Sequence, residues 1–380
     1  MSRSCLARSQ EGRVSFRAAE NRYTVSPALG NVLSLKRRII SEIGSNGPMP
    51  FERFMEISLY DPHGFFGGDS LRSQRAGDFL TSPEVSALFG ETLARYVAGI
   101  AEEIGDPFMV VEVGAGSGSL LRPLLEALPV EAMAVEASPA ARSALGTLVP
   151  VHDELPETIR GVAIANELLD NLPTALAQLT PQGWRERWVG VDDADLVFVD
   201  AAPRPDVLAW LDAYAGPVTE GGWVEVQLAA RAWVADVLAR LEVGAVVLVD
   251  YGDTAENLLP RRGDGTLRTY RAHHLGPHPL DEPGETDITS DVNFTALMDL
   301  DLGATLSRQD DFLSRLGLRD RLSEIRRREL EAAQSGDETQ RLKLRTLKTE
   351  AETLLHPRGL GDFRVLTFER LGTAANHRSS

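Results

Sequence analysis

Hydrophobic residues in the middle of the chain occur in short unbroken runs that alternate with amphipathic stretches. The runs are too short for buried helices and predict strands buried on both faces; they lie at 108–113, 130–135, 161–165 and 244–250. The intervening stretches have apolar residues at helical spacing and lie at 119–128, 140–148 and 229–241. Strands that alternate with helices predict an α/β fold around a mainly parallel sheet.

The flanking regions show other patterns. Residues 33–43 and 51–60 have helical spacing, and Ser82, as an N-cap before Pro83, predicts a further helix that runs to about residue 100. Alternating apolar and polar residues then predict β-hairpins between residues 175 and 200, with a helix after them. Near the carboxyl terminus, helices are expected at 312–316, 318–331 and 339–355. A last strand at 363–368 is expected to pair antiparallel at the sheet edge.

These patterns predict a helical amino-terminal cap at 31–105 and a core at 106–370. The core contains insertions at about 174–222 and 253–300, and the second is rich in glycine and proline, as binding loops often are.

The tails comprise residues 1–30 and 371–380. The first tail is rich in arginine, as transit peptides are, but Glu11 and Glu20 favour a disordered tail or an over-extended start site.

Three glycines at alternate positions follow the first buried run. Gly114, Gly116 and Gly118 can turn the backbone sharply and let a ligand approach it, and the next helix start offers free N–H groups. The second run ends in Glu136, 18 residues after Gly118, where a carboxylate can accept hydrogen bonds from both hydroxyls of a ribose. The alternative is a tight strand-to-helix turn in another kind of α/β protein.

The spacing of this turn is E-x-G-x-G-x-G, with Glu112 as the acid. It resembles the first motif of class I S-adenosylmethionine (SAM) methyltransferases, which implies SAM as the cofactor. We expect Glu112 to reach the methionine ammonium of SAM through water. Asp153 follows a short apolar stretch and is expected near the adenine.

Composition narrows the classes of partner. The 380 residues include 39 basic and 56 acidic side chains, a formal net charge of −17. This charge argues against nucleic-acid binding and against anionic membranes, and it suits a cationic substrate. The single cysteine excludes a disulfide framework, no histidine cluster has metal-ligand spacing, and no apolar run approaches the roughly 18 residues of a membrane span. We therefore expect no metal and a reducing compartment: the cytoplasm of a bacterium, or the mitochondrion if the source is eukaryotic.

Longer motifs are more specific than the glycine turn. They read LYDP at 59–62, GDFLTSPE at 77–84, NELLDNLP at 166–173, DYG at 250–252, and DIT and VNF within 287–294. Together they resemble the MidA family of SAM-dependent methyltransferases over residues 33–370. Leu168-Leu169 and Phe65-Phe66 replace aromatic pairs of that family, but both replacements stay apolar and neither removes a carboxylate. The resemblance implies a class I methyltransferase fold with a Rossmann-like, seven-stranded sheet.

The resemblance also implies that the amino-terminal cap covers the cofactor. The residues expected to do so are Gly77, Asp78, Thr81, Ser82 and Pro83. For Asp78 and Ser82, helix capping is the alternative role.

Polar residues after the third buried run are expected to carry the chemistry. Asn166, Glu167 and Asp170 follow that run, and the carboxyl ends of parallel strands face the ligand crevice. Glu167 and Asp170 are three residues apart and would share one face of a helical turn. Further contacts to the methyl acceptor are expected from Glu225, Tyr251, His273 and Asp287. The alternatives are a capping role for Asp170 and an exposed position for Glu225.

Several acids beside a sulfonium favour a guanidinium as the methyl acceptor. Arginine stays protonated, and carboxylates bind its planar fork with two hydrogen bonds. Together with the resemblance, this predicts a protein arginine methyltransferase whose partner is an acceptor protein. Two alternatives remain open: a small-molecule N- or O-methyltransferase, and a non-catalytic assembly or scaffold protein that keeps the fold.

Overall fold

The computed structural model describes residues 27–67, 81–271 and 274–372. Most of the expected leader or disordered tail, much of the carboxyl-terminal tail, and the predicted site residues Gly77, Asp78 and His273 lie outside the described residues.

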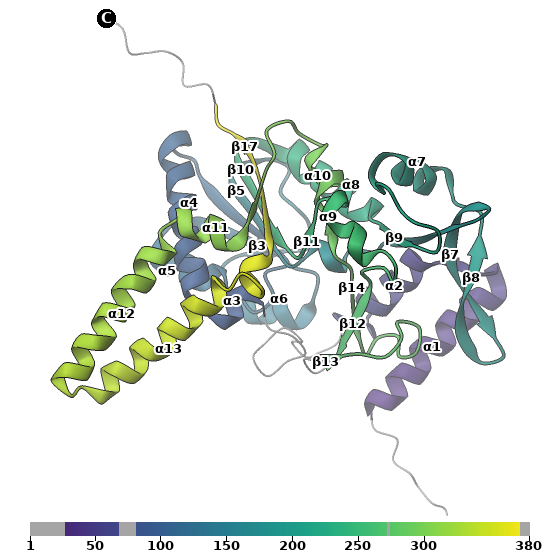
Figure 1. The fold of residues 1–380 in the computed structure, drawn as a ribbon, viewed down its shortest axis with the longest axis horizontal. Helices are drawn as coiled ribbons and strands as arrows, with labels where there is room; N and C mark the ends of the chain where they lie inside the picture. The colour runs from purple at the N-terminus through teal and green to yellow at the C-terminus, as the bar shows by residue number, and fades with distance from the viewer. Residues whose placement is uncertain (1–26, 68–80, 272–273, 373–380) are drawn as a thin grey trace, which may run out of the picture.

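A seven-stranded sheet forms the centre of the molecule (Figure 1). Its order is β16-β17-β10-β5-β2-β3-β4, and β10, β5, β2, β3 and β4 run parallel. The strands are β2 (Met109–Val113), β3 (Glu131–Val135), β4 (Val151–His152), β5 (Ile159–Asn166), β10 (Leu241–Asp250), β16 (Thr305–Arg308) and β17 (Arg364–Arg370). The buried apolar runs are therefore parallel strands, and the α/β, Rossmann-like fold class is confirmed.

Helices cover both faces of this sheet. Side chains of a strand alternate between the two faces, and these strands are apolar at successive positions, so each face must be buried. Val110 and Val162 pack with α4 (Leu88–Ile104), and Val111 and Ala163 pack with α8 (Leu228–Arg240). The face with α4 also carries α5 (Leu121–Ala127), α6 (Pro139–Leu145), α11 (Gln309–Arg315), α12 (Leu318–Ser335) and α13 (Glu338–Leu354). On the other face, α8 is joined by α10 (Phe294–Met298). The antiparallel pair α12–α13 projects from the body (Figure 1).

A second, five-stranded sheet joins the amino-terminal region to the predicted insertion. Its order is β1-β7-β6-β9, with β8 paired to β7. The strands are β1 (Met49–Pro50), β6 (Ala175–Thr180), β7 (Gly183–Asp192), β8 (Asp195–Ala201) and β9 (Trp223–Val226). Helices α1 (Pro27–Asn46) and α2 (Phe51–Tyr60) bury apolar residues against one face, and α7 (Pro205–Tyr214) packs on the other. The predicted hairpins are confirmed.

The glycine- and proline-rich insertion contains more regular structure than its composition indicates. β12 (Arg268–Arg271) pairs antiparallel with β13 (His274–Leu275) and with β14 (Asp287–Thr289). β11 (Gly252–Asp253) pairs with β15 (Val292–Asn293), and the short helix α9 (Ala255–Leu258) follows β11. Ile288 is buried in the apolar cluster of the five-stranded sheet, and Phe294 is buried in that of the seven-stranded sheet. The segment is therefore anchored to both sheets.

Two local predictions are wrong. The last strand, β17, does not lie at the sheet edge, because β16 pairs with its free side. The helix expected from Ser82 to about residue 100 is two helices, α3 (Ser82–Val85) and α4, separated by an extended Ser86. Thr81, not Ser82, is the N-cap; the Ser82 hydroxyl lies by Gln309 Oε1 (3.3 Å) instead.

Close backbone approach in the central sheet requires glycine at two paired positions. Gly161 and Gly244 lie opposite each other on β5 and β10, with φ values of 141° and 127°. A Cβ on Gly244 would lie 1.8 Å from the Gly161 carbonyl oxygen, and one on Gly161 would lie 2.0 Å from the Met109 carbonyl oxygen. These glycines let β2, β5 and β10 pack side by side where the strands begin.

We therefore expect Gly244→Ala to lower the free energy of unfolding by about 3 kcal/mol, the sum of overpacking and backbone strain. Gly99→Ala is the matched control, because Gly99 lies in α4 with no atom within 4 Å of its added Cβ. The control should stabilise by about 0.5–1 kcal/mol. Denaturant unfolding of both variants checks this, and equal stability of the two would contradict it.

Candidate active site

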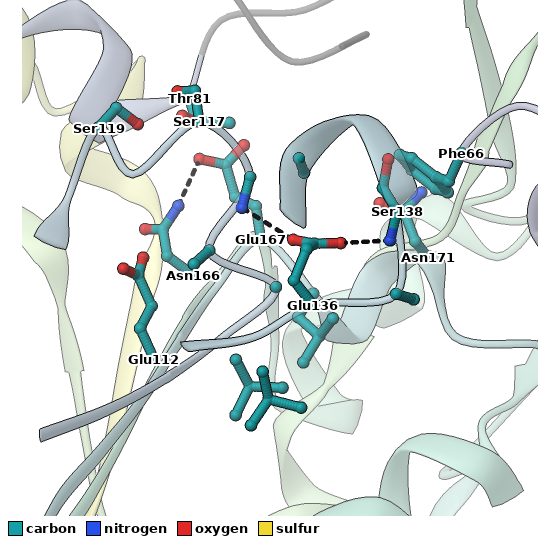
Figure 2. Close-up of a pocket in the computed structure, with 18 of the residues that line it drawn as sticks. Phe66, Thr81, Glu112, Ser117, Ser119, Glu136, Ser138, Asn166, Glu167 and Asn171 are labelled. Carbon is teal, nitrogen blue, oxygen red and sulfur yellow. Dashed lines mark hydrogen bonds between the residues drawn. The ribbon is translucent and has the colours of Figure 1, made fainter. Parts of the chain in front are cut away.

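A cavity of about 260 Å³ lies at the carboxyl edge of β2, β3 and β5 (Figure 2). The glycine turn, the ends of the three strands, the 81–84 segment and α2 all contribute to its wall. In this view Glu112, Asn166 and Glu167 lie on one side of Glu136, and Phe66 and Asn171 lie on the other. The cavity is therefore where parallel strands of an open α/β sheet place ligands.

The glycine turn presents bare backbone to this cavity. Gly114, Gly116 and Gly118 have φ values of 70°, 53° and 77°, which L side chains rarely adopt. Gly114 and Gly116 line the cavity, but Gly118 does not. A Cβ on Gly118 would lie 3.0 Å from Leu145 and 3.2 Å from Leu148, so this third glycine lets neighbouring segments pack.

Two backbone amides hold the Glu136 carboxylate in place. Its Oε2 accepts from Gly116 N–H (2.9 Å) and its Oε1 accepts from Ser138 N–H (2.8 Å), as Figure 2 shows. The first bond ties the acid at the end of β3 to the glycine turn after β2. Each carboxylate oxygen can accept more than one hydrogen bond, so capacity remains for a ligand.

Glu112, at the end of β2, is a buried carboxylate with an unsatisfied oxygen. The residue is 3% exposed, and its Oε2 has no hydrogen-bond partner among the described residues. Burial, and next the charge of Glu136, raises the pKa of Glu112 to about 8. An unsatisfied buried acid in a cavity wall is costly for the fold, and a cationic ligand would offset that cost.

Glu167 begins the segment after β5 in a strained backbone conformation. Its φ of 51° is in the left-handed region. Glu167 Oε1 accepts from Ser82 N–H and from Asn166 Nδ2, both at 3.2 Å. Burial, and next the charge of Asp170, raises the pKa of Glu167 to about 8. Asn166 also lines the cavity, and its Oδ1 has no partner in the described structure.

Asp170 and Tyr251 lie behind the wall of the cavity and do not line it. Asp170 is 3% exposed and accepts a hydrogen bond from the Tyr251 hydroxyl. Burial raises the pKa of Asp170 to about 7. Asp250 Oδ2 accepts from Leu169 N–H (2.9 Å) and Asp170 N–H (3.3 Å), which fixes the turn after Glu167.

Two carboxylates predicted to contact the methyl acceptor bind the protein itself. Glu225 Oε1 accepts from Thr266 N–H (2.6 Å) and from Leu267 N–H (3.2 Å). Asp287 accepts from the side chain of Asn171 (2.7 Å). Neither residue lines the cavity, because β9 and β14 place them outside its wall. Glu225 is also buried, contrary to the alternative of an exposed side chain.

The predicted cofactor residues of the amino-terminal cap divide into two groups. Thr81 and Pro83 line the cavity, whereas Ser82 is buried behind it and reaches it only through its N–H bond to Glu167. Asp153 lies at the rim, 4.0 Å from Arg142.

Several lining residues were not predicted from the sequence. They include Tyr60, Phe66, Glu84, Ser138 and Asn171. Tyr60, Phe66, Glu84 and Asn171 occur within or beside the motifs quoted above, so these motifs could have indicated them as site residues. The Tyr60 hydroxyl donates to the Asn171 carbonyl (3.1 Å), so α2 closes directly onto the turn after β5.

In the part of the chain that the structure describes, no three or more His, Cys, Asp or Glu side chains are arranged so that they could hold a metal ion. No helix within the described ranges is long and apolar enough to cross a membrane.

We expect Glu112→Gln to raise the melting temperature of the ligand-free protein at pH 8 by roughly 2 °C or more, since it removes a buried charge. The folded pKa of about 8 lies above the ordinary value of 4.5. The unsubstituted protein therefore loses stability as pH rises between these values. The gain should be small at pH 5. Exposed Glu131→Gln is the control, and thermal melts at both pH values check the result; a gain independent of pH would contradict it.

The chain matches a family model and proteins of known structure. The model describes S-adenosyl-L-methionine-dependent methyltransferases and matches residues 92–309. A crystal structure of a COG1565 superfamily member from Burkholderia thailandensis, bound to S-adenosyl-homocysteine, is 33% identical with a TM-score of 0.80. The match covers 91% of this chain and 94% of that one.

Curated relatives agree with these matches. A protein named "Protein arginine methyltransferase NDUFAF7, mitochondrial" from Bos taurus is 28% identical, and the match covers 84% of this chain and 79% of the relative. The Drosophila melanogaster homolog is 27% identical, with 69% and 68% covered. The resemblance to the MidA family is confirmed, and the chain belongs to this family of SAM-dependent methyltransferases.

Proposed function

We propose that this methyltransferase transfers the methyl group of SAM to an arginine side chain of an acceptor protein. The observation that carries the proposal is Glu167, a carboxylate at the cavity wall on strained backbone, which two donors hold in place. Strained residues concentrate at functional sites. The names of the curated relatives support arginine as the acceptor.

The residues around the glycine turn fit SAM. The turn at Gly114 and Gly116 would let the cofactor lie against bare backbone, and Glu136 would bind its ribose hydroxyls with its remaining lone pairs. Asp153 at the rim would lie near the adenine. Thr81 and Pro83 would cover the cofactor from the other side.

Glu112 would bind the positively charged end of the cofactor. Its unsatisfied Oε2 lies in the cavity wall, where an ammonium group could donate to it directly or through a water. A bound cation would lower the pKa of Glu112 from about 8 and keep the carboxylate ionised.

Glu167 and Asn166 would orient the acceptor. SAM supplies an electrophilic methyl group on a sulfonium; the S–C bond breaks as an N–C bond forms, and the electron pair of the broken bond stays on sulfur. The Glu167 carboxylate would bind the guanidinium in its plane and accept the proton that the attacking nitrogen loses. Asp170 would act indirectly as a positioning residue, since it lies behind the wall with Tyr251.

Gly116→Val should weaken SAM binding at least about tenfold, because its side chain would occupy the space of the ligand and strain a positive φ. Gly44→Val is the control, because Gly44 in α1 has no atom within 4 Å of its added Cβ. Calorimetric titration of SAM into the three proteins checks this. Equal affinity of Gly116→Val and the unsubstituted protein would contradict the assigned cofactor site.

Glu167→Gln should lower the rate of methyl transfer at least about 100-fold, the range of general-base contributions, while SAM binding persists. The ionised carboxylate is the active form, so kcat/KM of the unsubstituted enzyme should rise with pH up to about 8 and then level off. Labelled SAM with arginine-containing peptides measures both. Full activity of the variant would remove Glu167 from the mechanism.

A further inference from the structure

Gln309 is a completely buried polar residue that does not line the cavity. It begins α11, directly after the edge strand β16 of the central sheet. Its N–H donates to the Phe363 carbonyl (2.8 Å), and Phe312 and Leu313 of the same helix are buried in the apolar cluster on the α4 face. The backbone of Gln309 is therefore fixed in place, and so is the point from which its side chain extends.

The side chain of Gln309 binds Ser82, which lies 227 residues earlier in the chain. Gln309 Nε2 donates to Ser82 Oγ (3.1 Å), and Oε1 of the same amide lies 3.3 Å from this hydroxyl. Ser82 is also completely buried. Because a buried amide or hydroxyl without a partner is costly, the two side chains hold each other in place.

The backbone of Ser82 in turn holds Glu167. Ser82 N–H donates to Glu167 Oε1 (3.2 Å), and Asn166 Nδ2 donates to the same oxygen (3.2 Å). Asn166 is the sequence neighbour of Glu167, whereas Ser82 reaches the carboxylate from the amino-terminal cap. Pro83 and the capping box that begins at Thr81 restrict the backbone on either side of Ser82. A shift of the Ser82 hydroxyl therefore moves its N–H as well.

A second contact attaches the other end of α3 to the carboxyl-terminal region. Ser86 Oγ donates to Glu350 Oε2 of α13 (2.8 Å). This bond does not involve Ser82, so it stays in place when the bond between Gln309 and Ser82 is removed. Loss of the Gln309 bond should therefore loosen the end of α3 that carries the donor to Glu167 without releasing the whole segment.

We propose that Gln309 is a positioning residue for methyl transfer, which places Ser82 so that the Ser82 N–H holds the Glu167 carboxylate. This inference rests on the proposed function, because it requires Glu167 to act on the acceptor. Gln309 makes no contact with the cavity itself and acts through Ser82 alone. Enzymes depend on such supporting contacts because a small misplacement of a reacting group slows the reaction.

The contact from Ser82 also affects the ionisation of Glu167. Burial is the largest influence on the pKa of Glu167 and raises it, whereas the hydrogen bond from Ser82 N–H lowers it. The other ionisable groups that act on Glu167 are Asp170, Glu84 and Asp250, and the test changes none of them. A weaker bond from Ser82 should therefore raise the pKa of Glu167 further, so that less of the carboxylate is ionised below pH 8.

The test uses two single variants and their combination. Gln309→Met keeps a long unbranched side chain and removes the amide. Ser82→Ala removes the hydroxyl on the other side of the same bond and keeps the N–H. Thr92→Val is the matched control, because it removes another buried hydroxyl, which donates to the Leu88 carbonyl within α4 (2.6 Å) and does not line the cavity.

The main measurement is kcat/KM against pH, with labelled SAM and arginine-containing peptides. For Gln309→Met and Ser82→Ala we expect the rising part of the profile to move to higher pH by at least about half a unit, which lowers kcat/KM at pH 7 about threefold. The loss should shrink above about pH 9, where Glu167 is ionised in both proteins. Because the two variants break the same bond, the double variant should shift no further than the larger single shift.

Calorimetric titration of S-adenosylhomocysteine and a thermal melt accompany each profile. Affinity for S-adenosylhomocysteine should stay within about threefold of the unsubstituted protein. Thr92→Val should keep the pH profile of the unsubstituted protein, whatever its melting temperature.

Three results would overturn the assignment and leave the proposed function intact. An unmoved pH profile in Gln309→Met would make Gln309 a structural residue only, even if the melting temperature or the overall rate falls. A double variant whose shift is the sum of the single shifts would mean that Gln309 and Ser82 act separately. A loss of S-adenosylhomocysteine affinity of at least about tenfold would mean that Gln309 acts through the cofactor.

Failure of the proposed function gives a different result. If the unsubstituted protein binds SAM but labels no arginine peptide, or if Glu167→Gln is fully active, the proposed function and this inference fail together.

Discussion

The cost of ionising buried carboxyl groups at the carboxyl edge of the central sheet is the constraint on which the site depends. Burial raises the pKa of Glu112 and Glu167 to about 8 and that of Asp170 to about 7, and it raises the pKa of Asp250 as well. Within the described ranges none of these four acids forms an ion pair. Among the described residues, backbone amides, the Asn166 side-chain amide and the Tyr251 hydroxyl donate hydrogen bonds to these acids. A cationic ligand would stabilise the ionised form of these acids, so the site suits a sulfonium or a guanidinium.

The amino-terminal segment is part of this arrangement because it supplies donors that the sheet edge lacks. Thr81 and Ser82 present successive N–H groups to two carboxylates of the cavity wall. Ser82 is in turn buried against Gln309 at the start of α11, and Tyr60 of α2 bonds to the Asn171 carbonyl. Segments far apart in the sequence therefore close one cavity, and the cap is as much a part of the site as the strands are.

Motif carboxylates have two different uses in this protein. Glu112, Glu136 and Glu167 line the cavity, whereas Glu225 and Asp250 bind backbone amides and hold loops in position. Both groups contain buried acids at or near strand ends, so residue type and local sequence do not separate the two groups. Position in the two sheets decides which acid faces a ligand: Glu225 lies on a strand of the second sheet, and Asp250 ends β10, which is one strand farther from β2 than β5 is.

The sequence by itself determined the features that depend on local pattern. Apolar runs predicted the parallel strands, the alternate glycines and Glu136 predicted a ligand turn, and the motif after β5 predicted that Asn166 and Glu167 lie at the crevice. Tertiary structure decided what depends on distant contacts. Sequence pattern did not show that β16 covers β17, that Asp170 and Asp287 lie behind the wall, or that Glu84 lines the same cavity as Glu167. Strands and turns depend on neighbouring residues, so the sequence pattern can predict them. Strand order and the residues that line a cavity depend on which distant segments pack together, which local pattern does not show.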